Sequence, residues 1–217
     1  MMAASPEIRM RADARRNRDQ ILAAAREMFA AQGSDVPLEE IARTAGVGVG
    51  TLYRRFPDRE SLIRAVAKES LAQVLQDARA ASAEEPTGWD ALERLIAKSH
   101  QLQVSFQLAW SSSRVREILQ VDPEIGEIRN TLMAEIAQMV KNAQTEGTMR
   151  PDIGAGDMAV LFVLILRQSP AMDALGTFAA ERTVAIMLDG LRARSNGELP
   201  GHPITMEELR WPGIAKD

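Results

Sequence analysis

Apolar positions repeat at helical spacing along most of this chain, and the clearest repeat begins at residue 38. Four apolar residues there follow the spacing i, i+3, i+4 and i+7, which places them on one face of a short helix. They are Leu38, Ile41, Ala42 and Ala45. Glu39 and Glu40 occupy the first turn, where negative charge suits the helix dipole. Gly46 is expected to end this helix in the left-handed conformation.

A second short helix is predicted over residues 51–56, after a glycine-containing loop. Leu52 and Phe56 lie one turn apart, so both are expected to pack inward. The side chains left facing outward are Thr51, Arg54 and Arg55. Two helices that cross at a short turn, with Thr, Tyr and Arg on the second, match a unit that enters the major groove of DNA.

Longer helices are predicted on both sides of this pair. Apolar residues between Ile21 and Phe29 repeat at helical spacing, so a first helix packs beneath the pair and ends at Gln32 and Gly33. Pro57 and Asp58 break the chain and cap a further helix that runs to about Ala81. Residues 82–88 contain Glu, Pro and Gly and mark the end of this unit.

The remainder is also expected to be helical. Trp89 begins an amphipathic helix, and Asp122 and Pro123 cap and start another, which runs to about Thr145 and is closed by Gly147. No alternating strand pattern of useful length occurs, and aromatic residues make up only 4% of the chain, which disfavours a sheet. The predicted fold class is all-α, with an N-terminal three-helix head and a C-terminal helical body.

These boundaries divide the chain into four expected parts. They are a basic N-terminal arm (residues 1–17), the head with its connecting helix (18–81), the body (88–194) and a C-terminal tail (195–217). The tail is rich in Gly and Pro, so it is expected to be a loop, and no function is predicted for it.

Two apolar helices in the body favour a dimer. The run MAVLFVLIL at residues 158–166 is apolar on every helical face, so a helix there needs cover from its own body and from something else. A second apolar helix lies around residues 178–192, and two such helices per chain form a four-helix bundle across a twofold axis. The alternatives are a buried core helix or a central strand. The expected interface comprises Phe162, Leu166, Val184, Leu188 and Leu191.

The segment IARTAGVGVGTLYRRFPDRESL, residues 41–62, resembles the head of the TetR family of bacterial transcriptional regulators. The resemblance runs from about Arg18 to Val66 and follows the family pattern of IA, AGV, GTLY, F and a basic residue before E and L. It implies a helix-turn-helix over residues 38–56. It further implies that Tyr53 and Arg59 contact phosphates and that Thr51 and Arg54 lie near base edges.

Two residues depart from the family pattern, and both concern base preference. Gly48 stands where a Ser or Thr cap is usual, and Val49 replaces a residue that is frequently basic. The resemblance also implies a homodimer and a small-molecule pocket enclosed by the body helices.

Charge supports a DNA partner only through its distribution. The net charge is −4, but most of the negative charge follows residue 60. The first 18 residues carry five arginines against two acids, so this arm is expected to lie on phosphates or in the minor groove. A solvated tail is the alternative. The full set of expected DNA contacts is Thr44, Val49, Gly50, Thr51, Tyr53, Arg54, Arg55, Arg59, Arg15 and Arg18.

Catalytic and metal-binding motifs are absent from the sequence. Cysteine does not occur, and the two histidines, His100 and His202, lie far apart. No HExxH or GxSxG motif is present, and the glycines near residue 48 lack the strand and the Lys-Ser/Thr pair of a phosphate loop. We therefore expect no enzyme activity, cofactor or metal. No apolar run approaches the ~20 residues that span a bilayer, so we expect no membrane partner and a cytoplasmic location.

The effector pocket is only suggested by the sequence. Aromatic and hydrogen-bonding residues share neighbouring turns of one predicted helix, as in ligand cavities; they are His100, Gln103, Phe106, Gln107 and Trp110. Met133 is a candidate adaptable wall, and Arg167 a candidate partner for an anionic effector. The alternatives are a core position for Met133 and a buried salt bridge or helix end for Arg167.

Together these features predict a ligand-responsive transcriptional regulator. The expected protein is a repressor that binds a palindromic operator as a homodimer and is released by a small-molecule effector. The alternative is a helical ligand-binding or scaffolding protein whose head has lost DNA binding, because of Gly48 and Val49.

Overall fold

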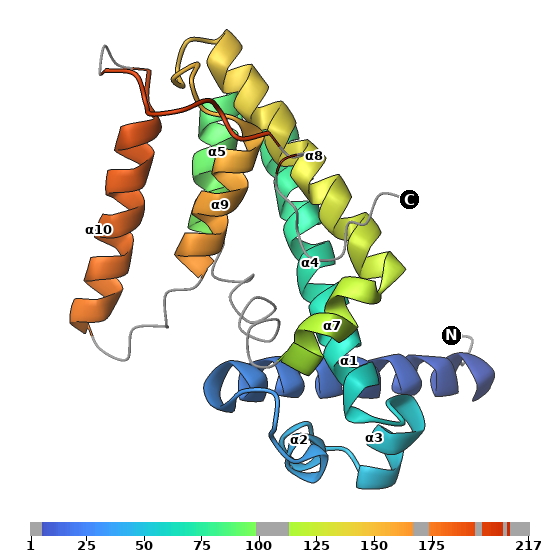
Figure 1. Cartoon of the computed structure of the whole chain (residues 1–217). Coiled ribbons are helices and arrows are strands. Elements are labelled where there is room, and N and C mark those ends of the chain that lie inside the picture. The colour runs from blue at the N-terminus through green and yellow to red at the C-terminus, as the bar shows by residue number, and fades with distance from the viewer. Residues whose placement is uncertain (1–5, 99–112, 167–173, 194–196, 206–207, 209–217) are drawn as a thin grey trace.

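The computed structural model describes residues 6–98, 113–166, 174–193, 197–205 and 208, and its regular elements there are all helices. Figure 1 shows α1 lying across the base of the long helix α4, with α2 and α3 beneath it and the remaining helices above. The helices are α1 (Pro6–Gln32), α2 (Leu38–Thr44), α3 (Val49–Arg55), α4 (Arg59–Glu84), α5 (Gly88–Ala97), α7 (Ser113–Val121), α8 (Pro123–Thr145), α9 (Ala155–Leu166) and α10 (Ala174–Leu191).

The first helix is longer than its apolar pattern indicates. It begins at Pro6, so the expected basic arm is helical from that residue and continues without a break into the head. Ile21, Leu22 and Phe29 are buried on its inner face. Gly33 has a φ of +86°, a left-handed conformation that favours glycine, and it ends the helix after Gln32 as expected.

Helix α4 belongs to both the head and the body. Its first turns bury Leu62, Ile63 and Val66 in a head core with α1, α2 and α3. Farther along, Val74 and Ala78 lie in a separate body core with α5, α8 and α9. The two cores therefore divide within α4, near residue 70, rather than at the turn before α5.

Local capping sets where α4 begins. The Asp58 carboxylate accepts a hydrogen bond of 2.7 Å from the Ser61 backbone N–H, and the Ser61 hydroxyl accepts one of 3.4 Å from the Asp58 N–H. This reciprocal arrangement satisfies two backbone donors that the first helical turn would otherwise leave free. The expected cap at Asp58 is confirmed.

Helix α8 begins and ends where its sequence signals predicted. The Asp122 carboxylate accepts a hydrogen bond of 3.1 Å from the Ile125 N–H, and Pro123 occupies the first turn. The helix ends at Thr145, and Gly147 beyond it has a φ of +72°. The predicted helix from Pro123 to about Thr145 is therefore confirmed.

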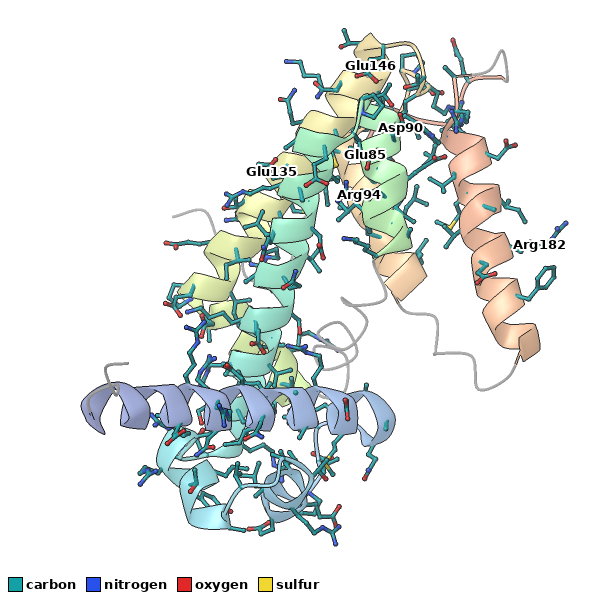
Figure 2. All side chains as sticks on the ribbon, turned by 180° about the vertical axis from the view of Figure 1, so that it is seen from behind. Glu85, Asp90, Arg94, Glu135, Glu146 and Arg182 are labelled. Carbon is teal, nitrogen blue, oxygen red and sulfur yellow. The ribbon has the colours of Figure 1, made fainter. Side chains whose placement is uncertain are left out.

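Helices α5 and α8 approach closely because of a glycine. A Cβ atom at Gly88 would lie 2.6 Å from the backbone of Ala143, which leaves no room for a side chain. The Gly88 N–H also donates to both carboxylate oxygens of Glu146, at 3.1 and 2.9 Å. Figure 2 shows Glu146 at the end of the body that is farthest from the head.

The described part of the tail is anchored, which its sequence did not indicate. Ile204 lies so close to the turn before α9 that a Cβ atom at Gly154 would be 2.1 Å from the Ile204 carbonyl oxygen. The Asp157 carboxylate accepts hydrogen bonds from the N–H groups of Gly154 and Ile204, at 2.7 and 2.9 Å. The tail therefore packs on the start of α9. Trp211 lies outside the described residues.

The expected interface residues of α9 and α10 are placed mostly inward. Phe162 and Leu191 are buried in the body core of the same chain, so they form no surface for a partner. Val184 and Leu188 are half-buried against that core, and the side chain of Leu166 is not among those described. Among the side chains of these two helices that the structure describes, the large apolar ones that face outward are Leu164, Phe178 and Ile186. In the chain's described part, no helix has both the length and the hydropathy to cross a membrane.

Candidate nucleic-acid interface

Helices α2 and α3 form a compact helix-turn-helix. Gly46 follows α2 with a φ of +67°, a left-handed conformation that reverses the chain at little steric cost. Helix α3 starts at Val49, two residues before its predicted start, with extended Gly48 as the N-cap residue and no side-chain cap. Leu52 and Phe56 are buried in the head core, as expected. This packing holds the opposite side of α3 toward solvent.

The outer side of α3 carries large exposed side chains. Val49 and Tyr53, one turn apart, are each 41% exposed, which is unusual for apolar and aromatic residues. Thr51 is half-buried, so it faces outward less than expected. The other exposed positions of the predicted contact set on this unit are Thr44, Gly50, Arg54 and Arg55.

Several exposed arginines of the head lack acidic partners among the described residues. In the described residues, five exposed arginines of the head form no ion pair: Arg15, Arg16, Arg43, Arg54 and Arg55. Arg18 lies 3.9 Å from Asp19. By contrast, Arg79 pairs with Glu135 at 3.3 Å and Arg94 with Glu85 at 2.8 Å in the body (Figure 2). Unpaired guanidinium groups around an exposed helix form a surface that favours an anionic partner.

Tyr53 is oriented by a contact between the two short helices. Its hydroxyl donates a hydrogen bond of 2.9 Å to the Glu39 carboxylate of α2. This bond raises the pKa of the Tyr53 phenol. A backbone hydrogen bond and then the Tyr53 hydroxyl lower the pKa of Glu39, which keeps this carboxylate charged. The ring is therefore held in place, but beside a negative charge.

Arg59, an expected phosphate contact, also has an internal role. Its Nη1 atom donates to the carbonyl oxygens of Ser34 and Val36, at 2.6 and 2.5 Å. Arg59 therefore ties the start of α4 to the loop between α1 and α2. The phosphate contact implied by the resemblance would have to use its remaining N–H groups.

Helix α7 connects the body to this unit. Val115 and Leu119 of α7, with Ile125 of α8, are buried in the head core. The Arg114 guanidinium donates two hydrogen bonds to Glu60 in the first turn of α4, at 3.1 and 2.9 Å. These bonds raise the pKa of Arg114. A body helix is thus part of the head that supports α3, which the sequence did not reveal.

Most residues proposed for the effector pocket lie outside the described residues. These are His100, Gln103, Phe106, Gln107, Trp110 and Arg167. Met133 is half-buried and packs against the body core. A wholly apolar cavity of about 10 Å³ lies between α5, α9 and α10, which is room for no more than about one water molecule. Its lining side chains are Ile96, Met158, Leu161, Phe162, Val184, Met187, Leu188 and Leu191.

Comparison with protein families gives two matches along the chain. Residues 21–66 match the family described as "Bacterial regulatory proteins, tetR family". Residues 99–193 match the family described as "Transcriptional regulator SbtR-like, C-terminal domain". An HTH-type transcriptional regulator of Staphylococcus aureus strain USA300 is 38% identical over 63 residues, which cover 29% of this chain and 34% of that protein. The matched segment thus spans about a third of this curated relative.

Solved structures extend the likeness to more than four fifths of the chain. A TetR transcription regulatory protein from Mycobacterium vanbaalenii is 30% identical with a TM-score of 0.62, and the match covers 84% of this chain and 99% of that one. A TetR regulator from Streptomyces coelicolor is 32% identical with a TM-score of 0.62, with coverages of 81% and 98%. A gamma-butyrolactone receptor, 20% identical with a TM-score of 0.62 and coverages of 83% and 89%, shares the fold. Because likeness at this identity extends over nearly all of two solved TetR regulators, the chain belongs to the TetR family of bacterial transcriptional regulators.

Proposed function

We propose that this regulator is a repressor that binds a palindromic operator as a homodimer and is released by a small-molecule effector. The observation that carries the DNA-binding part is the exposed outer side of α3 with unpaired arginines around it. Arg54 and Arg55 lie on α3, and Arg43 lies on α2 beside it. In this arrangement α3 enters the major groove, and the arginines of α1 reach the flanking phosphates.

The proposed dimer forms through the outward apolar side chains of α9 and α10. Leu164, Phe178 and Ile186 are 50%, 59% and 63% exposed. Phe178 and Ile186 are eight residues apart, so they share one face of α10. Large exposed apolar side chains on neighbouring helices mark a protein interface, and a twofold axis lets the same patch cover itself. This patch replaces the interface set expected from the sequence, because Phe162 and Leu191 face inward.

Dimer symmetry would set how the two heads meet DNA. A twofold axis through the α9 and α10 patch relates two copies of α3, so the operator contains two inverted half-sites. Their centres are separated by one helical turn of DNA, about 34 Å, or a multiple of it. The operator sequence depends on base contacts from α3, where Val49 stands in place of a residue that is frequently basic in the family.

Helix α7 is the proposed link between effector and head. Its Val115 and Leu119 pack in the head core, so a shift of α7 relative to the body would move α4 and, with it, α3. A tenfold loss of operator affinity requires an effector to favour the displaced arrangement by only about 1.4 kcal/mol. A gamma-butyrolactone receptor with the same fold makes a small-molecule effector a reasonable expectation for this chain.

The DNA-binding proposal is tested with two variants of equal charge change. Fragments of the source genome are bound to the purified protein at several salt concentrations, and the selected sites are titrated with the Arg54→Ala and Lys141→Ala variants. Lys141 is an exposed lysine on α8, away from the head. Arg54→Ala is expected to weaken specific binding by about 1–3 kcal/mol, while Lys141→Ala leaves it unchanged.

Two outcomes would contradict the proposal. If the wild-type protein binds no fragment at low salt, the head has lost DNA binding and the chain is instead a ligand-binding or scaffolding protein. If the Arg54→Ala and Lys141→Ala variants weaken binding equally, the exposed side of α3 is not the reading surface.

A further inference from the structure

The head core and the body core meet in a layer that contains polar groups. Along α4, Ala67 is the last residue of the head core and Val74 the first of the body core. Along α8, Ile125 belongs to the head core and Leu132 to the body core. Leu71 packs against both. Ser70 of α4 and Arg129 of α8 occupy the interval between the cores.

Neither of these polar side chains has a partner among the residues that the structure describes. Ser70 is only 3% exposed, and its hydroxyl oxygen is buried without a hydrogen bond. Arg129 is half-buried, its Nε atom is buried without a partner, and no carboxylate pairs with its guanidinium. Buried polar groups are normally satisfied, and buried charges are normally paired. The Ser70 hydroxyl and the Arg129 Nε atom are therefore two exceptions to this rule in one layer.

The register of α4 against α8 brings these two groups to the same level. Lys68 pairs with Glu124, and Arg79 pairs with Glu135 eleven residues farther along, so residues separated by 56 positions lie at matching heights. By this register Gly126 lies level with Ser70. The Nη2 atom of Arg129 is 3.9 Å from the position of a Cβ atom at Gly126. The guanidinium therefore extends back along α8 to the level of Ser70.

The surroundings of Arg129 are apolar. Ile125, Leu132 and Met133 lie on the same side of α8, three or four residues from it. Burial lowers the pKa of Arg129, and no acidic group among the described residues pairs with it. A partly desolvated cation at the level of a buried hydroxyl that forms no hydrogen bond is costly in the free protein and attractive to an incoming anion.

We propose that Arg129 and Ser70 form an anion subsite for the effector, which would be a small organic acid with an apolar body. The guanidinium would pair with the carboxylate, sulfonate or phosphate of the ligand, and the Ser70 hydroxyl would donate a hydrogen bond to it. The apolar part would lie along the half-buried Met133 of α8. This inference rests on the proposed effector-responsive function, and it places the ligand where the head core meets the body core.

The test compares anionic probes with neutral probes of the same shape. Binding of decanoate and of 8-anilinonaphthalene-1-sulfonate is measured by calorimetry and fluorescence without DNA, beside 1-decanol and N-phenyl-1-naphthylamine. Arg129→Met is expected to weaken the binding of both anions by about tenfold or more and to leave the binding of the neutral probes unchanged. Arg129→Lys should retain most of the anion affinity, and Ser70→Ala should lose part of it.

Lys141→Met is the matched control, because it removes the same charge from the exposed side of α8 and should bind all four probes as the wild type does. A second measurement uses the free protein: Arg129→Met should raise Tm by about 2–4 °C, since it removes a half-buried charge that has no partner among the described residues. If it does not fold, Arg129→Gln takes its place.

The outcomes separate this proposal from the proposed function. If the wild type binds neither anion, or if Arg129→Met binds both as tightly as the wild type, the subsite is refuted. If the wild type binds anions through Arg129 but binds no DNA, the subsite stands and the repressor function fails. If Arg129→Met keeps its DNA affinity but decanoate no longer changes that affinity, both proposals are supported.

Discussion

At the scale of single residues, two side chains of the head have internal partners that bear on DNA binding. Arg59 donates to the carbonyl oxygens of Ser34 and Val36, so it positions α4 against the preceding loop. Tyr53 donates to Glu39, so its hydroxyl is occupied in the free protein. Phosphate binding by Tyr53 would compete with Glu39, whose charge also repels the DNA backbone. Glu39 is therefore expected to limit affinity.

Glu39→Gln should increase DNA affinity. The glutamine oxygen can still accept the Tyr53 hydrogen bond, so the substitution removes the charge while it preserves the contact. We expect affinity to rise by about two- to fivefold on every sequence, with a smaller gain at high salt because the removed interaction is screened. Fluorescence anisotropy of labelled DNA at two salt concentrations measures the change in affinity. Glu127→Gln, an exposed position on α8, is the charge-matched control, and an equal gain there would show that the effect is not local.

At the scale of elements, α7 joins the two halves of the molecule. Helix α7 begins at Ser113, far along the chain from the N-terminal head, yet its Val115 and Leu119 are buried in the head core. The turn between α4 and α5 therefore does not separate head from body, because α7, which follows it in the chain, packs in the head core. Helices α4 and α8 have residues in both cores and couple their stabilities, whereas displacing α7 exposes apolar surface in the head core.

Leu119→Ala should destabilise the head although the residue lies in the C-terminal half of the chain. Loss of a buried leucine costs about 2–5 kcal/mol through lost transfer energy and the cavity left behind. Val121→Ala is the control on the same helix, because Val121 is exposed, and it should change stability by less than about 0.5 kcal/mol. Urea denaturation followed by circular dichroism gives both values. Equal effects of the two substitutions would mean that α7 does not pack in the head core.

At the scale of the whole molecule, assembly decides whether two copies of α3 can reach one operator. Helix α10 stands at the edge of the body beside α9, with Arg182 pointing away from the other helices (Figures 1 and 2). The side of α10 toward the body core carries the half-buried Val184 and Leu188. The opposite side carries Phe178 and Ile186 in solvent, so one chain alone leaves apolar area uncovered.

Ile186→Arg should convert the proposed dimer into a monomer. A charge at the centre of an apolar interface loses its hydration without gaining a partner, and in a twofold dimer it does so twice. Sedimentation should then show the 23.8 kDa chain instead of a particle of twice that mass. Val121→Arg places the same charge on an exposed valine of α7 and should leave the mass unchanged. A dimer that survives Ile186→Arg would place the interface elsewhere.

The local features of this protein were predictable from the order of its amino acids. The spacing of Leu38, Ile41 and Ala42 predicted α2, and Asp58 and Asp122 predicted the starts of α4 and α8. These signals are readable because helix periodicity, caps and left-handed glycines depend on residues only a few positions apart. The family pattern in the head follows the same short-range chemistry, so it too was visible in the sequence.

Features that depend on residues far apart in the chain became visible in the packed molecule alone. The run at residues 158–166 is apolar on every face, so periodicity could not show that Phe162 points inward while Leu164 points outward. Gly154 carries no sign that Ile204 lies against it, and nothing near Arg59 indicates that it binds carbonyl groups more than twenty residues away. Such contacts arise when separate helices pack together, and each depends on where the partner element lies in space.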